Sequence, residues 1–149
     1  MSSFVGALAV DSLNRLYSGG AFDQAGGVST YRFARWDGQD WTPGGHWEFE
    51  RVNDIKVGGN DIVYAAWMNT TVNGDIFTVS PWNGVYWALW GKNMDSPVSA
   101  LALDSSGNLY TGGFFTTAGT VTVNYLSRWD GGTWSAIGGG MNGPVTALI

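Results

Sequence analysis

The sequence contains no cysteine, one histidine and few charged residues, and each absence excludes a class of site. Without cysteine the chain has no disulfide, no thiolate metal ligand and no cysteine nucleophile. His46 is the only histidine, so a metal site with two histidines cannot form within one chain. The seven Lys and Arg residues are scattered, and the net charge is −5. Because the phosphates of nucleic acid require clustered positive charge, we expect no nucleic-acid partner.

Longer patterns are absent as well. No stretch has the periodicity of an amphipathic helix, and no apolar run is long enough to span a membrane. The apolar run 4–10 is also short for a signal peptide. The sequence lacks the Gly-x-Ser-x-Gly motif of serine hydrolases and the dense Asp-x-Asp-x-Asp spacing of a calcium loop. We therefore expect no membrane insertion, no cofactor, no metal and no catalytic residue.

Glycine and aromatic residues are abundant instead. The 149 residues include 23 Gly, 9 Trp, 7 Phe and 6 Tyr, and 44% of the chain is hydrophobic. This is enough apolar material for a core, and the length suits one domain. A composition rich in glycine and poor in charge is typical of many short strands joined by tight turns. We expect an all-β fold.

A repeat of 46 or 47 residues organises the chain. The stretch VGALAVDSLNRLYSGGAFDQAGG from Val5 aligns without a gap on VSALALDSSGNLYTGGFFTTAGT from Val98, an offset of 93 residues. A more divergent middle copy begins at Val52. The first, second and third units are about 5–51, 52–97 and 98–144, and residues 145–149 repeat the start of a unit.

Each unit is expected to form four antiparallel strands. In the first unit these are VGALAVD, RLYSGGAF, YRFARWD and DWTPG, separated by turn-forming residues. A four-stranded unit that repeats every 40 to 50 residues or so is typical of a β-propeller blade, with residues 145–149 as one extra strand.

Residues that recur in register are interpreted as structural. The glycine pair of the second strand would allow close approach near a crowded axis, and the last Trp of each unit would fill the wedge between sheets. The Trp-Asp-Gly stretch would form the hairpin between the third and fourth strands. The blade residues are Tyr17, Gly19, Gly20, Trp36, Asp37, Gly38 and Trp41, then Tyr64, Trp82 and Trp87, then Tyr110, Gly112, Gly113, Trp129, Asp130, Gly131 and Trp134.

These motifs resemble the kelch-like repeats of the galactose oxidase central-domain family, in their bacterial and phage form. LYSGG and LYTGG, followed by RWDGQDW and RWDGGTW, carry the resemblance over the first and third units. The second unit departs from it, because Ala66 and Trp67 replace the glycine pair and Asn83 replaces the aspartate. The resemblance implies a β-propeller. It does not extend to the copper site of galactose oxidase, whose second His and Cys this sequence lacks.

Three blades and one strand would form an open arc, because known propellers have about four blades or more. Two blade faces would stay uncovered, and such apolar surfaces usually mark interfaces. We expect half of a six-bladed ring that a second copy completes as a homo-oligomer. The alternative is that neighbouring blades belong to a longer chain.

Aromatic residues that only one unit carries are the candidate ligand or partner contacts: Trp47 beside His46, Tyr86 and Trp90. Exposed Trp and Tyr can stack on sugar rings or anchor a protein partner. The other interpretation is that they fill gaps left by the lost glycines of the second unit. Aspartates at the turns are expected to share one acidic face, and whether that face binds calcium stays open; they are Asp11, Asp37, Asp40, Asp61, Asp104 and Asp130.

The favoured function is a non-enzymatic structural or recognition module that binds glycan or protein through one face. We expect it outside a cell, at a cell surface or on a phage particle, where it would serve in adhesion. One alternative is an architectural virion component without a ligand. The other is a polysaccharide hydrolase, which requires carboxylates about 5 to 10 Å apart near the ring axis.

Overall fold

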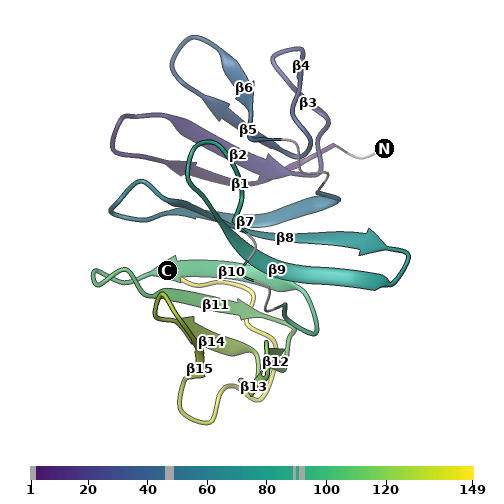
Figure 1. Cartoon of the computed structure of the whole chain (residues 1–149), viewed down its shortest axis with the longest axis vertical. Helices are drawn as coiled ribbons and strands as arrows, with labels where there is room; N and C mark the ends of the chain where they lie inside the picture. The colour runs from purple at the N-terminus through teal and green to yellow at the C-terminus, as the bar shows by residue number, and fades with distance from the viewer. Residues whose placement is uncertain (1–2, 46–48, 89, 91–92) are drawn as a thin grey trace.

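The computed structural model shows an all-β chain, which confirms the fold class expected from composition (Figure 1). It describes residues 3–45, 49–88, 90 and 93–149. Over these ranges there is no helix that could cross a membrane. Three antiparallel sheets follow one another in chain order, and two small hairpins accompany them.

The first sheet is built by the first unit. Its strand order is β1 (Val5–Val10), β2 (Leu16–Gly20), β5 (Phe33–Trp36) and β6 (Trp41–Pro43). A small hairpin of β3 (Gln24–Ala25) and β4 (Val28–Ser29) interrupts the connection from β2 to β5. All neighbours are antiparallel, so the turns after β1 and β5 lie at the same end of the sheet.

The third sheet repeats this arrangement with a different sequence. Its order is β10 (Val98–Leu103), β11 (Leu109–Gly113), β14 (Leu126–Trp129) and β15 (Trp134–Ala136). The accompanying hairpin is β12 (Thr117–Ala118) and β13 (Val121–Thr122). Its register is that of the first sheet, with Leu109 opposite Trp129 where the first sheet pairs Leu16 with Trp36.

The middle sheet differs from the expected four strands. It contains β7 (Arg51–Val57), β8 (Val63–Thr71) and β9 (Gly74–Trp82). β8 and β9 pair without interruption up to a tight turn, because both are rich in β-branched and aromatic residues and Gly74 adopts a φ of 115° at the turn. In place of a fourth strand, β9 makes two isolated bridges to the described residues that follow it, Trp82 with Trp87 and Phe77 with Met94.

The sheets stack face to face, and two apolar clusters fill the spaces between them (Figure 1). The first junction, between the first and middle sheets, buries Tyr17, Phe33, Phe49, Val52, Ile55, Val63, Ala65, Trp67, Trp82 and Trp87. The second junction, between the middle and third sheets, buries Ala66, Val79, Met94, Val98, Leu101, Leu109, Phe115, Ala118, Val123, Trp129 and Trp134. β7 lies against both β1 and β10, so the first strands of the three units are neighbours.

Each of these first strands carries a β-bulge at the same place. The register shifts between Val5 and Ala7, between Val52 and Asp54, and between Val98 and Ala100. A bulge adds one residue and bends the strand. The three first strands therefore share one shape although their sequences differ.

Residues 145–149 do not form the extra strand that the repeat predicts. A first strand pairs with the second strand of its own unit, and this segment has no such strand among the described residues. It nevertheless lies on the third sheet, where the N–H of Val145 donates to the carbonyl of Gly113 at 3.1 Å. The Val145 side chain covers Gly112 in the same way that Val52 covers Gly19.

Candidate functional site

The outer face of the first sheet is an exposed apolar surface. Val5, Leu8 and Val10 of β1 are 56%, 60% and 56% exposed. The equivalents of Val5 and Leu8 are buried because the preceding sheet covers them; they are Val52 and Ile55 at 0%, Val98 at 2% and Leu101 at 0%. The equivalents of Val10, which are Val57 and Leu103, are partly buried. Among the described residues no sheet covers this side of β1, and the face is open to solvent.

Trp41 extends this apolar surface. It lines a cavity of about 510 Å³ together with Val5, Leu8, Leu16 and Phe22. Its equivalents, Trp87 and Trp134, are 3% and 5% exposed, whereas Trp41 is only partly buried. The difference arises because Trp87 and Trp134 each pack against the preceding sheet.

The face of the third sheet at the other end of the stack is partly covered. Val145 and Leu148 lie over Gly112, at the positions where Val52 and Ile55 lie over Gly19 in the first junction. One backbone hydrogen bond, from Val145 to Gly113, ties this segment to β11. The end face of the third sheet is therefore covered by a short segment instead of a sheet.

Trp90, predicted as a ligand contact, packs inside the second junction. Its ring lies 5.9 Å from Tyr64, 4.6 Å from Trp129 and 6.3 Å from Trp134. In the first junction the ring of Phe33 contacts the three equivalent residues, which are Tyr17, Trp82 and Trp87. Trp90 thus takes the place of Phe33, whose own equivalent in the middle sheet is the smaller Val79.

Tyr86 is the other predicted contact residue that the structure describes. Tyr86 lies on the hairpin after β9 and is 60% exposed. His46 and Trp47 fall outside the described residues. Of the four candidate contact residues, Tyr86 is therefore the one that the structure shows to be exposed.

The Trp-Asp-Gly hairpins hold themselves together through their acidic or amide residue. The carboxylate of Asp37 accepts hydrogen bonds from the N–H groups of Gln39 and Asp40. Asp130 does the same for the two residues that follow Gly131, and Asn83 for Val85 and Tyr86. These contacts explain why an aspartate and an asparagine can exchange at this place between units.

The turn between the first and second strands has the same backbone in each unit but different side chains. In the first unit the carboxylate of Asp11 accepts hydrogen bonds from the Arg15 N–H, the Arg15 guanidinium and the Tyr17 hydroxyl. Burial disfavours the charge of Asp11, but these hydrogen bonds hold its pKa below the ordinary value. Burial and the contact with Asp11 raise the pKa of Tyr17 to about 12.

The third unit repeats this carboxylate and tyrosine pair, and the second unit lacks it. Asp104 accepts a hydrogen bond of 3.2 Å from the hydroxyl of Tyr110. The equivalent of the aspartate in the second unit is Gly58, so the Tyr64 hydroxyl has no carboxylate partner there. Burial alone raises the pKa of Tyr64. Its hydroxyl is therefore a protonated donor at neutral pH.

Neighbouring turns are bridged in the first junction. The hydroxyl of Ser12 donates to Asp61 at 2.6 Å, and the Ser12 N–H donates to the other carboxylate oxygen at 3.0 Å. The equivalent positions in the second junction are Gly59 and Gly107, which have no side chains to form a bridge.

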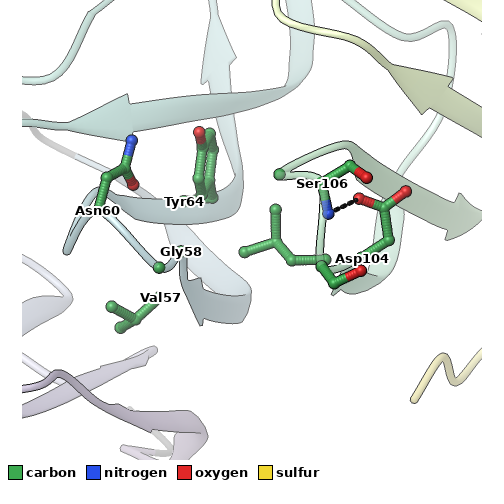
Figure 2. Close-up of a pocket in the computed structure, with 10 residues that line it drawn as sticks. Val57, Gly58, Asn60, Tyr64, Asp104 and Ser106 are labelled. Carbon is green, nitrogen blue, oxygen red and sulfur yellow. Dashed lines mark hydrogen bonds between the residues drawn. The ribbon is translucent and has the colours of Figure 1, made fainter.

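A cavity of about 520 Å³ lies between the turns of the second junction (Figure 2). Figure 2 shows Asn60 and Tyr64 of the β7–β8 turn region on one side, with Asp104 and Ser106 of the β10–β11 turn on the other. Its remaining lining residues are Val57, Gly58, Gly59, Leu103, Ser105 and Gly107. We call this space the turn cavity.

Two polar residues of β7 tie the first strands together at the second junction. The side-chain amide of Asn53 donates to the carbonyl of Val98 at 2.8 Å, and Asp54 accepts from the N–H of Leu101 at 2.7 Å. Lys56 pairs with Asp54 at 3.1 Å. We did not identify these residues from the sequence. The signal was available, because the first and third units carry Gly, Ser or Ala where the second has Asn-Asp.

Carboxylates are sparse on the three first strands. Asp54 is the only carboxylate on β1, β7 and β10, and it is engaged by Leu101 and Lys56. Over the described ranges, no three His, Cys, Asp or Glu side chains gather closely enough to hold a metal ion. No protein-family model matches the sequence, and no curated protein matches it either.

Proposed function

We propose that the chain is a β-propeller-type structural module that assembles with a second copy through the exposed face of its first sheet. The three units would be blades around a common axis, with β1, β7 and β10 as their inner strands. One observation carries the proposal: Leu8 is 60% exposed, whereas its equivalents Ile55 and Leu101 are fully buried by a preceding sheet.

The two junctions within the chain support a second copy of the same chain as the partner. A face with Val, either Leu or Ile, and Trp at these positions is covered twice within the chain, each time by a sheet of the same repeat. Trp82 packs on Tyr17 in the first junction, and Trp90 links Tyr64 to Trp129 in the second. The same contact is incomplete at both ends of the stack. At one end Trp36 and Trp41 have no preceding sheet to pack against, and at the other end Tyr110 has no following sheet. A second copy supplies both halves.

The burial of apolar side chains would make the free energy of such a contact favourable. Complete burial of a Val or Leu side chain contributes roughly 1.5–3 kcal/mol. Val5, Leu8 and Val10 lie on one strand and would be covered together. The second copy's β1 would have to replace residues 145–149 on the third sheet. That segment is tied to β11 by one backbone hydrogen bond, so a whole sheet would displace it.

Measurement of the molar mass over a concentration series by sedimentation velocity tests this assembly. We expect a dimer for the unmodified chain and a monomer for Leu8→Asp, because the charge would be buried against an apolar sheet. Val72→Asp is the matched control, since Val72 is fully exposed at a hairpin tip. A chain that stays monomeric at every concentration, or equal behaviour of the two variants, contradicts the proposal.

A second variant tests the part played by the C-terminal segment. Leu148→Asp should loosen residues 145–149 from the third sheet and so strengthen the dimer, because the segment and the incoming β1 compete for one surface. A weaker dimer would show that the segment belongs to the interface instead. Location at a cell surface or on a phage particle stays a prediction from the resemblance.

A further inference from the structure

The turn cavity is a place where the second junction has lost side chains that the first junction possesses. Three positions differ: Gly58 replaces Asp11, Gly59 replaces Ser12, and Gly107 replaces Asp61. At the first junction these residues anchor a tyrosine hydroxyl and bridge the two turns. At the second junction the absence of these side chains leaves an open space. It also leaves the hydroxyl of Tyr64 without a carboxylate partner.

The size of the turn cavity is that of a small-molecule site. Its volume of about 520 Å³ falls within the range of roughly 300–1,000 Å³ that such sites occupy. The backbone supports the opening, since nothing lies within 4 Å of where a Cβ of Gly59 or Gly107 would be. The cavity is therefore not closed by neighbouring side chains.

The lining of the cavity selects among ligand classes. It combines the hydroxyls of Ser105, Ser106 and Tyr64 and the carboxamide of Asn60 with the apolar side chains of Val57 and Leu103. The side-chain oxygen of Asn60 accepts a hydrogen bond from the Ile62 N–H at 3.2 Å, and the side-chain NH₂ group is left to donate to a ligand. No Lys, Arg or His lines the cavity among the residues that the structure describes, which disfavours an anionic ligand.

The one carboxylate of the lining is already engaged. Asp104 accepts hydrogen bonds from the N–H groups of Ser106 and Asn108, from the Asn108 side chain and from the Tyr110 hydroxyl. It therefore shapes the turn and offers no free charge for a cation. What remains is a set of neutral donors and acceptors beside apolar surface.

We propose that the turn cavity binds a neutral, hydroxyl-rich small ligand, a single sugar residue, through Tyr64, Asn60 and the serines of the β10–β11 turn. A pyranose ring presents hydroxyls at its edge and C–H groups on its faces, and it matches a lining of hydroxyls, an amide and aromatic or aliphatic carbon. The site lies between the second and third units, away from the exposed face of the first sheet, and it does not depend on dimer formation.

Titration of the ¹⁵N-labelled chain with methyl glycosides of glucose, galactose and mannose, followed by amide NMR, tests the site. We expect at least one glycoside to shift the amides of Asn60, Ser105 and Ser106. Inorganic phosphate and glucuronate should leave these amides in place. An absence of shifts with all three neutral glycosides, or stronger shifts with the anions, overturns the proposal.

A double variant closes the cavity by copying the first junction. Gly59→Ser with Gly107→Asp installs the Ser12–Asp61 pair, and Asp61 itself shows that an aspartate adopts a positive φ at this turn position. The glycoside shifts should disappear while the rest of the amide spectrum is kept. Gly132→Ser, on a different exposed hairpin, is the control and should bind as the unmodified chain does. Unchanged binding by the double variant contradicts the proposed location.

Tyr64→Phe isolates the hydroxyl because the ring is kept. Loss of one hydrogen bond should weaken glycoside binding about three- to tenfold. Tyr17→Phe is the matched substitution at the first junction, where the hydroxyl is held by Asp11, and it should leave glycoside affinity unchanged. Equal effects of the two substitutions would show that Tyr64 acts only through stability.

Discussion

The two junctions between sheets solve one packing problem with different residues. In the first junction Phe33 of the preceding sheet contacts Trp82 and Trp87, and a serine and aspartate bridge the turns. In the second junction Trp90 supplies the missing ring, and polar contacts from Asn53 and Asp54 join the inner strands. The first junction is closed at its turns, whereas the second is joined at its inner edge and open at its turns.

The two junctions therefore have side chains at the same places in space, although these side chains come from different positions in the repeat. Trp90 follows the fourth-strand position of its own unit and yet occupies the place that Phe33 fills from a third strand. A gap created by the small residue Val79 is filled by a residue from another part of the unit. The units can therefore diverge without loss of the stack.

The largest effect should come from the ring at the centre of each junction. Phe33 is 1% exposed and touches three aromatic rings, so Phe33→Ala should lower the free energy of unfolding by about 3–5 kcal/mol. Trp90→Ala should produce a loss of the same order if Trp90 replaces Phe33. Urea denaturation measures both. A near-neutral Trp90→Ala would break the equivalence.

The next effect concerns the inner edge of the second junction. Asp54→Ala removes the acceptor of the Leu101 N–H and the partner of Lys56, and it should cost about 1.5–3 kcal/mol. Ala7 is the equivalent residue of the first unit, and Ala7→Ser should change stability little by comparison. The same urea experiment decides the point, and a neutral Asp54→Ala would show that the inner edge does not hold the junction.

A smaller effect distinguishes the first junction from the end of the stack. A Cβ on Gly19 would lie 2.5 Å from Val52 Cγ1 and 2.7 Å from Ile55 Cδ1, so Gly19→Ala should cost about 1–3 kcal/mol. Gly112→Ala meets Val145 at the same distance, but residues 145–149 can move away. Thermal unfolding should therefore show a smaller loss for Gly112→Ala. Equal losses would mean that the C-terminal segment is held as firmly as β7.

The smallest effect is the pH dependence of stability that comes from Asp11, whose equivalent in the second unit is Gly58. Hydrogen bonds from Arg15 and Tyr17 hold the pKa of Asp11 below its ordinary value despite burial. Its stabilising contribution is present at neutral pH and is lost as the pH falls from about 4 through the lower pKa of the folded state. Asp11→Asn should flatten the fall in melting temperature over this range. An unchanged dependence of the melting temperature on pH would show that Asp11 does not contribute to it.

Much of the fold could be predicted because the copies of the repeat can be compared with one another within one sequence. Composition predicted the all-β architecture, and the alignment of Val5 with Val98 predicted the strands of the first and third units. It failed for the fourth strand of the second unit, because pattern alone does not show how far a strand pairs. It failed also for residues 145–149, because a strand needs a partner that its own sequence does not provide.

The candidate sites were harder to predict from the sequence. Residues unmatched between units were interpreted either as surface contacts or as gap fillers, and Trp90 packs against the core of the second junction as a gap filler would. The turn cavity arises from what is missing at Gly58, Gly59 and Gly107, and small residues give no positive signal in a sequence. Only the spatial comparison with Asp11, Ser12 and Asp61 shows that something was lost.

The bulge shared by the three first strands bears on the history of the chain. A bulge is a local insertion that pairing tolerates at many places along a strand, so three independent origins would scatter it. Here it falls after Val5, Val52 and Val98, although Gly, Asn and Ser occupy the bulged position. Such a shared irregularity is the mark of duplication from one ancestral unit. On this view the fold grew by copying, and the bulged first strand kept its shape while the side chains and the outer strands of the middle unit diverged.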